Sequence, residues 1–85
     1  MARRDRPHAL ADAELQQLIR DLGDGVRTIR MAAGMSQDVM SSRTSLSQGD
    51  ISDLELGKRI ATLSTLWRIA RVCGVDLRIT FVQRD

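Results

Sequence analysis

The regular pattern of apolar residues begins near Asp12. From there to about Ala33 apolar residues recur three or four positions apart, the spacing of one face of an α-helix. They are Leu15, Leu18, Ile19, Leu22, Val26 and Ile29. Asp12 is suited to cap the start of this helix. Because a glycine inside a helix costs about 1 kcal/mol, Gly23 and Gly25 predict a kink, or a helix end at which Asp24 caps a second helix.

Glycine and serine residues divide the next stretch, 34–57, into two short helices. Gly34 ends the long helix, Ser36 and Ser47 can each cap a following helix, and Gly57 can end the last one in the left-handed conformation. A tight turn of about residues 44–46 separates the two short helices. The apolar residues placed to face one core are Met40, Leu46, Ile51 and Leu54. This arrangement holds the second helix outward, where it fits the major groove of DNA.

The last two patterns differ in period. Thr62 can cap a helix that Gly74 ends, with a broad apolar face. That face consists of Leu63, Leu66, Trp67, Ile69, Ala70 and Cys73. From Val75 to Val82 the period becomes that of a half-buried strand. There the apolar Leu77, Ile79 and Phe81 alternate with Arg78 and Thr80.

The chain has no second strand for this segment, so we expect it to pair antiparallel with the same segment of another copy. The sequence therefore predicts an all-α fold of four to five helices, with a short C-terminal strand that pairs between subunits. It divides into a flexible basic arm (1–11), a helix-turn-helix domain (12–75) and a dimerisation strand (76–85). The arm carries Arg3, Arg4 and Arg6.

Size and composition agree with this picture. A chain of 85 residues forms one domain whose small core gains from dimerisation. The net charge of +2 permits nucleic acid as a partner without requiring it. Cys73 is the sole cysteine, which rules out an internal disulfide and favours a core role, and His8 has no clustered residues with which to hold a metal. No metal or cofactor is expected.

Other classes of protein lack their usual signals. The chain has no glycine-rich phosphate loop and no nucleophile beside a base, so we do not expect an enzyme. It also has no apolar run long enough for a signal peptide or a membrane span. The expected location is the cytoplasm of a bacterium or phage host, without membrane association.

From Arg30 to Leu77 the sequence resembles the Xre/Cro family of phage-repressor-like helix-turn-helix domains. Three runs carry the resemblance. They are Gly34-Met35-Ser36-Gln37, residues 51–59 (ISDLELGKR), and the closing-helix positions Leu63, Leu66, Ile69, Ala70, Gly74 and Val75. The resemblance implies double-stranded DNA as a partner, read by the helix that begins after Ser47.

The resemblance also assigns roles to single residues. The implied base-facing positions are Gln48, Gly49, Ser52 and Asp53. The implied contacts to the DNA backbone are Gln37, Arg43, Lys58 and Arg59, to which the arm could add Arg3, Arg4 and Arg6. The simpler alternative for Gln48 and Ser52 is a solvated helix face. The alternative for the arm is a solubilising tail.

Arg30 and Glu55 stand where the family commonly has an ion pair that joins the first helix to the recognition helix. Two positions depart from the family. Ser41 replaces a usual alanine and needs an acceptor, for which a carbonyl one turn earlier is a candidate. Ser45 replaces the usual glycine of the turn and must adopt the left-handed conformation if the turn is standard. In addition, residues 36–57 carry a net charge of −3, which opposes phosphate.

Three functions fit these observations. The first is an autoregulatory repressor that binds a palindromic operator as a homodimer, with half-sites about 34 Å apart. The second is the antitoxin of a toxin–antitoxin pair, because a recognition domain followed by a dimerising strand is similar in architecture to the HipB-type antitoxins. The third is a protein-interaction module with weak DNA binding, which the net charge of −3 favours.

Overall fold

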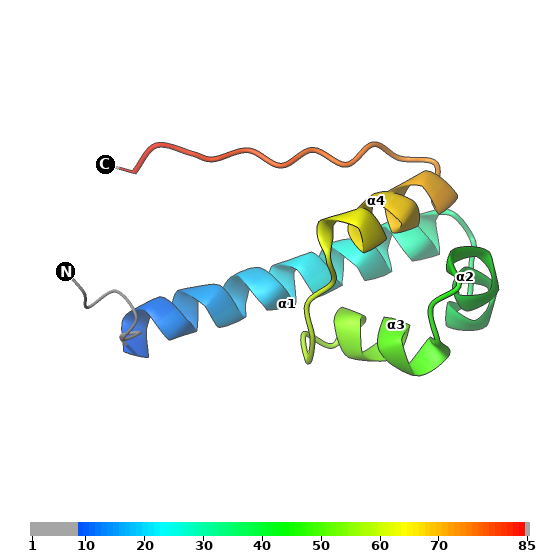
Figure 1. Cartoon of the computed structure of the whole chain (residues 1–85), viewed down its shortest axis with the longest axis horizontal. Helices are drawn as coiled ribbons and strands as arrows, with labels where there is room; N and C mark the ends of the chain where they lie inside the picture. Colours follow the sequence, from blue (N-terminus) through cyan, green and yellow to red (C-terminus); the bar gives the residue numbers. More distant parts are fainter. Residues whose placement is uncertain (1–8, 85) are drawn as a thin grey trace.

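The computed structural model describes residues 9–84, which contain four α-helices (Figure 1). The helices are α1 (Ala9–Ala32), α2 (Gln37–Thr44), α3 (Gln48–Glu55) and α4 (Leu63–Val72). Helix α3 packs on α1 and α2, and α4 contacts α2. All three short helices gather at the C-terminal half of α1, so its N-terminal half projects beyond them (Figure 1). None of the described helices is long and apolar enough to cross a membrane.

Helix α1 differs from the prediction in two ways. It begins at Ala9, so Asp12 lies in its first turn and is not its N-cap. It also continues through Gly23 and Gly25, so the predicted kink or second helix start is wrong. The glycine at position 23 is explained by packing between α1 and α3. A Cβ atom there would lie 2.3 Å from the carbonyl oxygen of Leu54 and 2.8 Å from that of Glu55. Glycine is what lets α1 approach the end of α3 so closely.

The predicted caps of the shorter helices are confirmed. The side chains of Ser36, Ser47 and Thr62 each accept a hydrogen bond from the backbone N–H three residues later. Gly34, Gly57 and Gly74 have φ values of 73° to 75°, and each follows a helix. At each of these ends two backbone bonds close back onto the last turn, as in a Schellman motif. Local sequence therefore determines where the helices end.

The core lies between the C-terminal half of α1 and the three short helices. Its buried members are Val26, Met40, Ile51, Leu54 and Ile69, with Leu46 packed against them. The prediction that both short helices face one core is thereby confirmed. The broad apolar face of α4 is only partly buried, because Leu63 and Trp67 remain 62% and 57% exposed.

Residues 75–84 are extended and run back along α1 toward its N-terminal end (Figure 1). No strand is formed within the described part of this single chain, so the predicted pairing between subunits stays a prediction. Leu77 is half-buried, whereas Ile79 and Phe81 are 60% and 97% exposed. Among the described residues, Ile79 and Phe81 therefore have little cover, in contrast to Leu77.

Candidate nucleic-acid interface

Helix α3 presents two different sides. Ile51, Leu54 and Glu55 face inward, with no more than 7% of each residue exposed. The four residues expected to face bases fall on the other side. Gln48, Gly49 and Asp53 are exposed, and Ser52 is half-buried. The outward side of α3 is therefore free to contact another molecule, and its inward side fixes the orientation.

The turn between α2 and α3 is held by side chains as well as by the backbone. Ser45 has a φ of 65°, so it adopts the left-handed conformation expected of a standard turn. The Ser41 hydroxyl donates to the carbonyl of Leu46, across the turn and not one turn earlier as expected. Thr44 is fully buried; its hydroxyl donates to the Met40 carbonyl at 2.7 Å and accepts from Leu46 N–H at 3.3 Å. These bonds fix the angle between the two helices.

Sequence reasoning missed the role of Thr44. A threonine late in a helix that can bond the carbonyl four residues earlier was the available signal. Arg68 of α4 was missed as well. Its guanidinium donates to the Thr44 carbonyl at 3.1 Å, which ties α4 to the end of α2. These two residues are 24 positions apart, so no local pattern could have revealed the contact.

The expected ion pair between α1 and α3 is present and nearly buried. The Arg30 guanidinium donates twice to the Glu55 carboxylate, at 2.7 and 3.0 Å, with side-chain exposures of 11% and 4%. Arg30 also donates to the Met35 carbonyl at 2.8 Å. The amide of Gln37 donates to the same carboxylate at 3.1 Å. Glu55 thus joins α1, α2 and α3.

The pKa values of this cluster reflect its hydrogen bonds. Burial raises the pKa of Glu55, but the hydrogen bonds from Arg30 and Gln37 outweigh burial, so that the pKa is lowered overall. The hydrogen bond to Glu55 raises the pKa of Arg30. Burial raises the pKa of the nearby Cys73 thiol, which suits the core role expected of it. The ion pair is therefore charged on both sides at neutral pH.

Residues 26–79 match the helix-turn-helix family of the Xre/Cro type. The chain belongs to this family. It is also 33% identical over 55 residues to y4dJ of Sinorhizobium fredii, an uncharacterized HTH-type transcriptional regulator, and the match covers 65% of this chain and 71% of that protein. Families of this type regulate transcription by binding DNA, and the matched residues include α3.

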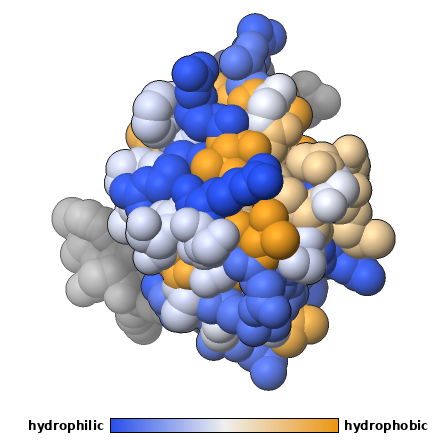
Figure 2. Space-filling model, turned by 90° about the vertical axis from the view of Figure 1, so that its right-hand side faces the viewer, coloured by the Kyte–Doolittle hydropathy of each residue, from blue (hydrophilic) through white to orange (hydrophobic). Residues whose placement is uncertain are grey.

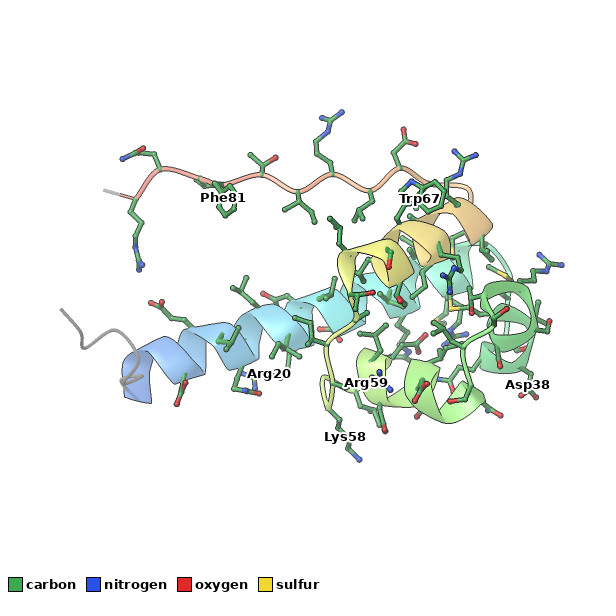
Figure 3. The ribbon with its side chains drawn as sticks, viewed as in Figure 1. Arg20, Asp38, Lys58, Arg59, Trp67 and Phe81 are labelled. Atoms are coloured by element: carbon green, nitrogen blue, oxygen red, sulfur yellow. The ribbon has the colours of Figure 1, made fainter. Side chains whose placement is uncertain are left out.

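Within this helix-turn-helix domain, the net charge of −3 is offset by arginines from outside residues 36–57. Arg30 neutralises Glu55, and Arg59 forms an ion pair with Asp50 in the first turn of α3. Arg59 turns toward α3 from the loop that follows it, whereas Lys58 extends into solvent (Figure 3). Asp50 and Glu55 therefore oppose phosphate less than their formal charges suggest. Sequence spacing gave no sign of the pair between Arg59 and Asp50.

The other residues expected to contact the DNA backbone differ in how far their side chains are exposed and already bonded. Lys58 and Arg43 are exposed, and one nitrogen of Arg43 lies 3.8 Å from the sulfur of Met35. Gln37 is half-buried and bound to Glu55. Hydrophilic and weakly polar side chains cover most of the end of the molecule around α2, with apolar patches between them (Figure 2). Arg3, Arg4 and Arg6 lie outside the described residues.

Proposed function

We propose that this protein is a sequence-specific repressor that binds a two-fold-symmetric operator as a homodimer. The observation that carries the proposal is the geometry of α3. Its inner side is locked by the core and by Glu55, while Gln48, Gly49, Ser52 and Asp53 occupy the outer side. A helix held in this way enters the major groove with the residues of its first turns closest to the bases.

The side chains on this outer side suit base recognition. A glutamine such as Gln48 can bond adenine through two hydrogen bonds, and a serine such as Ser52 can bond several base edges. Asp53 can accept a hydrogen bond from the amino group of cytosine. Gly49 leaves room for the helix to approach the groove. The outer side of α3 therefore reads sequence.

Contacts to the phosphates would come from around α3. Arg43 and Lys58 supply positive charge, and Arg59 adds to it where a phosphate competes with Asp50 for its guanidinium. Gln37 can donate its second amide N–H to a phosphate while the first stays on Glu55, or exchange the bond to Glu55 for a phosphate. The arm with Arg3, Arg4 and Arg6 would lie along phosphates or enter a minor groove. Such contacts set affinity and make it dependent on salt.

A dimer is required for a symmetric operator. The uncovered apolar side of residues 77–81 supports pairing with a second copy, which would place two α3 helices about 34 Å apart, one turn of DNA. Binding across a promoter in the cytoplasm would block transcription by occlusion. The protein's own promoter is the first operator to test.

Fluorescence anisotropy with labelled promoter DNA at two salt concentrations tests the reading of bases. We expect the wild type to prefer the promoter over random DNA, and Gln48→Ala with Ser52→Ala to lose that preference while remaining folded by circular dichroism. The matched control is Gln16→Ala with Thr28→Ala, two exposed residues of α1. Equal binding of the wild type to promoter and random DNA would contradict sequence reading and favour the protein-interaction module.

Operator symmetry is tested on the DNA. Destroying one half-site of the operator should weaken binding by at least tenfold, because a dimer then has one specific contact surface in place of two. Equal affinity for intact and half-destroyed operators would rule out a symmetric dimer.

A second function, compatible with the first, is favoured by the projecting half of α1. Leu15 and Leu18 are 47% and 65% exposed there, outside the residues that match the family. An antitoxin would use this surface to bind its toxin. Co-expression with the product of the neighbouring gene tests this: Leu15→Asp with Leu18→Asp should abolish a stable complex and leave DNA binding intact.

A further inference from the structure

An open apolar groove of about 670 Å³ lies where α4 meets the C-terminal segment. It is lined by Leu63, Ser64, Trp67, Leu77 and Ile79. Trp67 lies on the side of α4 that faces this segment (Figure 3). More than half of Leu63, of Trp67 and of Ile79 is exposed to solvent. A groove with this lining suits an aromatic or a large aliphatic side chain.

Phe81 has the chemistry to fill the groove but does not line the groove of its own chain. It is the sole phenylalanine of the protein and is 97% exposed. It lies two residues beyond Ile79, the last residue in sequence that lines the groove, and Figure 3 shows it beyond the N-terminal end of α4. A segment that runs in the opposite direction over the groove would carry a second Phe81 back to it.

An antiparallel pairing of two copies supplies that segment, and the apolar alternation together with the lining of the groove selects its register. With Ile79 opposite itself on the two-fold axis, Leu77 stands opposite Phe81 of the partner subunit. With Arg78 on the axis, Leu77 stands opposite Ile79 and Val75 opposite Phe81 of the partner subunit. Only the first register places Phe81 beside a residue that lines the groove, because Leu77 belongs to the lining and Val75 does not. A shift that centres the axis on Thr80 would instead set Leu77 opposite the polar Gln83. Centring it on Leu77 would set Phe81 opposite Cys73, which belongs to the end of α4.

We infer that each subunit inserts Phe81 into the groove of Leu63, Trp67 and Leu77 on its partner, with Ile79 on the two-fold axis. This inference rests on the homodimer of the proposed function and specifies its register and its apolar contact. The two grooves and the two Phe81 side chains bury one another reciprocally, as a two-fold interface requires.

Trp67 reports on the contact directly, because it is the only tryptophan. As protein concentration rises through dimerisation, followed by analytical ultracentrifugation, the Trp67 emission should move to shorter wavelength. Phe81→Ala should weaken the dimer at least tenfold and abolish the shift. The matched control is Val82→Ala, since Val82 is 85% exposed and lies on the other side of the segment. A dimer that forms without any change in Trp67 emission would overturn the inference.

Disulfide cross-linking tests the register. In a Cys73→Ser background, Ile79→Cys should form a cross-linked dimer readily under mild oxidation, whereas Thr80→Cys and Phe81→Cys should not. A mixture of Leu77→Cys and Phe81→Cys chains should cross-link as a heterodimer. Preferential cross-linking of Arg78→Cys or of Thr80→Cys would overturn the register with Ile79 on the axis.

The outcomes separate this inference from the proposed function. If Phe81→Ala dimerises and binds the operator as the wild type does, the inference fails and the proposed function stands. If the wild type stays monomeric at all concentrations and on operator DNA, both the homodimer and the inference fail. A monomeric Phe81→Ala that still prefers one half-site over random DNA supports the inference and leaves base reading intact.

Discussion

Two ion pairs between arginine and glutamate show how differently the two parts of the molecule are built. In the inner part, residues 23–75, Arg30 and Glu55 are nearly buried and joined by two hydrogen bonds. In the outer part, residues 9–22 and 76–84, Arg84 lies 3.4 Å from Glu14, with side-chain exposures of 83% and 53%. The buried pair joins two helices of the inner part, whereas the exposed pair of the outer part contributes little to stability.

The apolar residues follow the same division. Inner residues such as Ile51 and Leu54 are buried, whereas outer residues such as Leu18 and Phe81 are mostly exposed. The inner part therefore buries its central polar and apolar groups, although Leu63 and Trp67 of α4 remain exposed. The outer part presents groups that a second molecule can cover, and both proposed protein contacts use it, one of them together with Leu63 and Trp67 of α4.

The largest effect is expected from removing the inner carboxylate. Glu55→Ala leaves Arg30 buried without its partner, which costs about 3–5 kcal/mol. Glu14→Ala removes an exposed pair and should cost less than about 1 kcal/mol. Urea unfolding of both variants measures the two differences. Equal losses of unfolding free energy in the two variants would contradict the difference between the inner and outer parts.

The next effect distinguishes two glycines of α1. Gly23→Ala places a Cβ against the carbonyl of Leu54 and should cost roughly 1–3 kcal/mol. Gly25 is exposed with nothing near its Cβ position, so Gly25→Ala should stabilise the protein by about 0.5–1 kcal/mol. Thermal unfolding measures both changes. A stabilising Gly23→Ala would show that α1 does not approach α3 as closely as described.

A smaller gain is expected at the turn. Ser45 holds the left-handed conformation, which glycine adopts without steric cost, so Ser45→Gly should stabilise by about 0.5–1 kcal/mol. Its side chain makes no cap that the change would remove. Ser47→Ala is the contrasting control, because it removes an N-cap and should cost about 1 kcal/mol. Loss of stability in Ser45→Gly would contradict this account of the turn.

The effect of pH on Glu55 is expected to be smaller than that of Glu55→Ala, since only the pKa difference of one carboxyl contributes. Its folded pKa lies below the ordinary value of 4.5. Its contribution to stability is therefore complete above that value and is lost as pH falls through the folded pKa. Urea unfolding between pH 7 and pH 3 should show a shallower decline in Glu55→Gln than in the wild type. Parallel declines would assign the acid sensitivity to other carboxyl groups.

Local sequence determined where the short helices of this protein begin and where each helix before a left-handed glycine ends. The caps at Ser36, Ser47 and Thr62 and the left-handed glycines after each helix depend on residues close in the chain, because the hydrogen bonds concerned span a few positions. The family pattern further indicated the ion pair of Arg30 with Glu55 and the outward side of α3. The ion pair and the outward side were predictable because the family pattern assigns a role to each of these positions.

Only the tertiary structure decided how closely the helices approach, which distant residues pair and which apolar side chains stay exposed. From the sequence Gly23 predicts a break in the helix, and only the close packing of α3 explains why a glycine is there. The pairs of Arg59 with Asp50 and of Arg68 with Thr44 join residues that no periodic pattern relates. Leu63 and Trp67 belong to an apolar face, yet they stay exposed because the described residues of one chain cover less than half of each. Local sequence specifies where an element begins and ends and which side is apolar, while the distance between packed elements and the cover over an apolar side depend on the whole assembly.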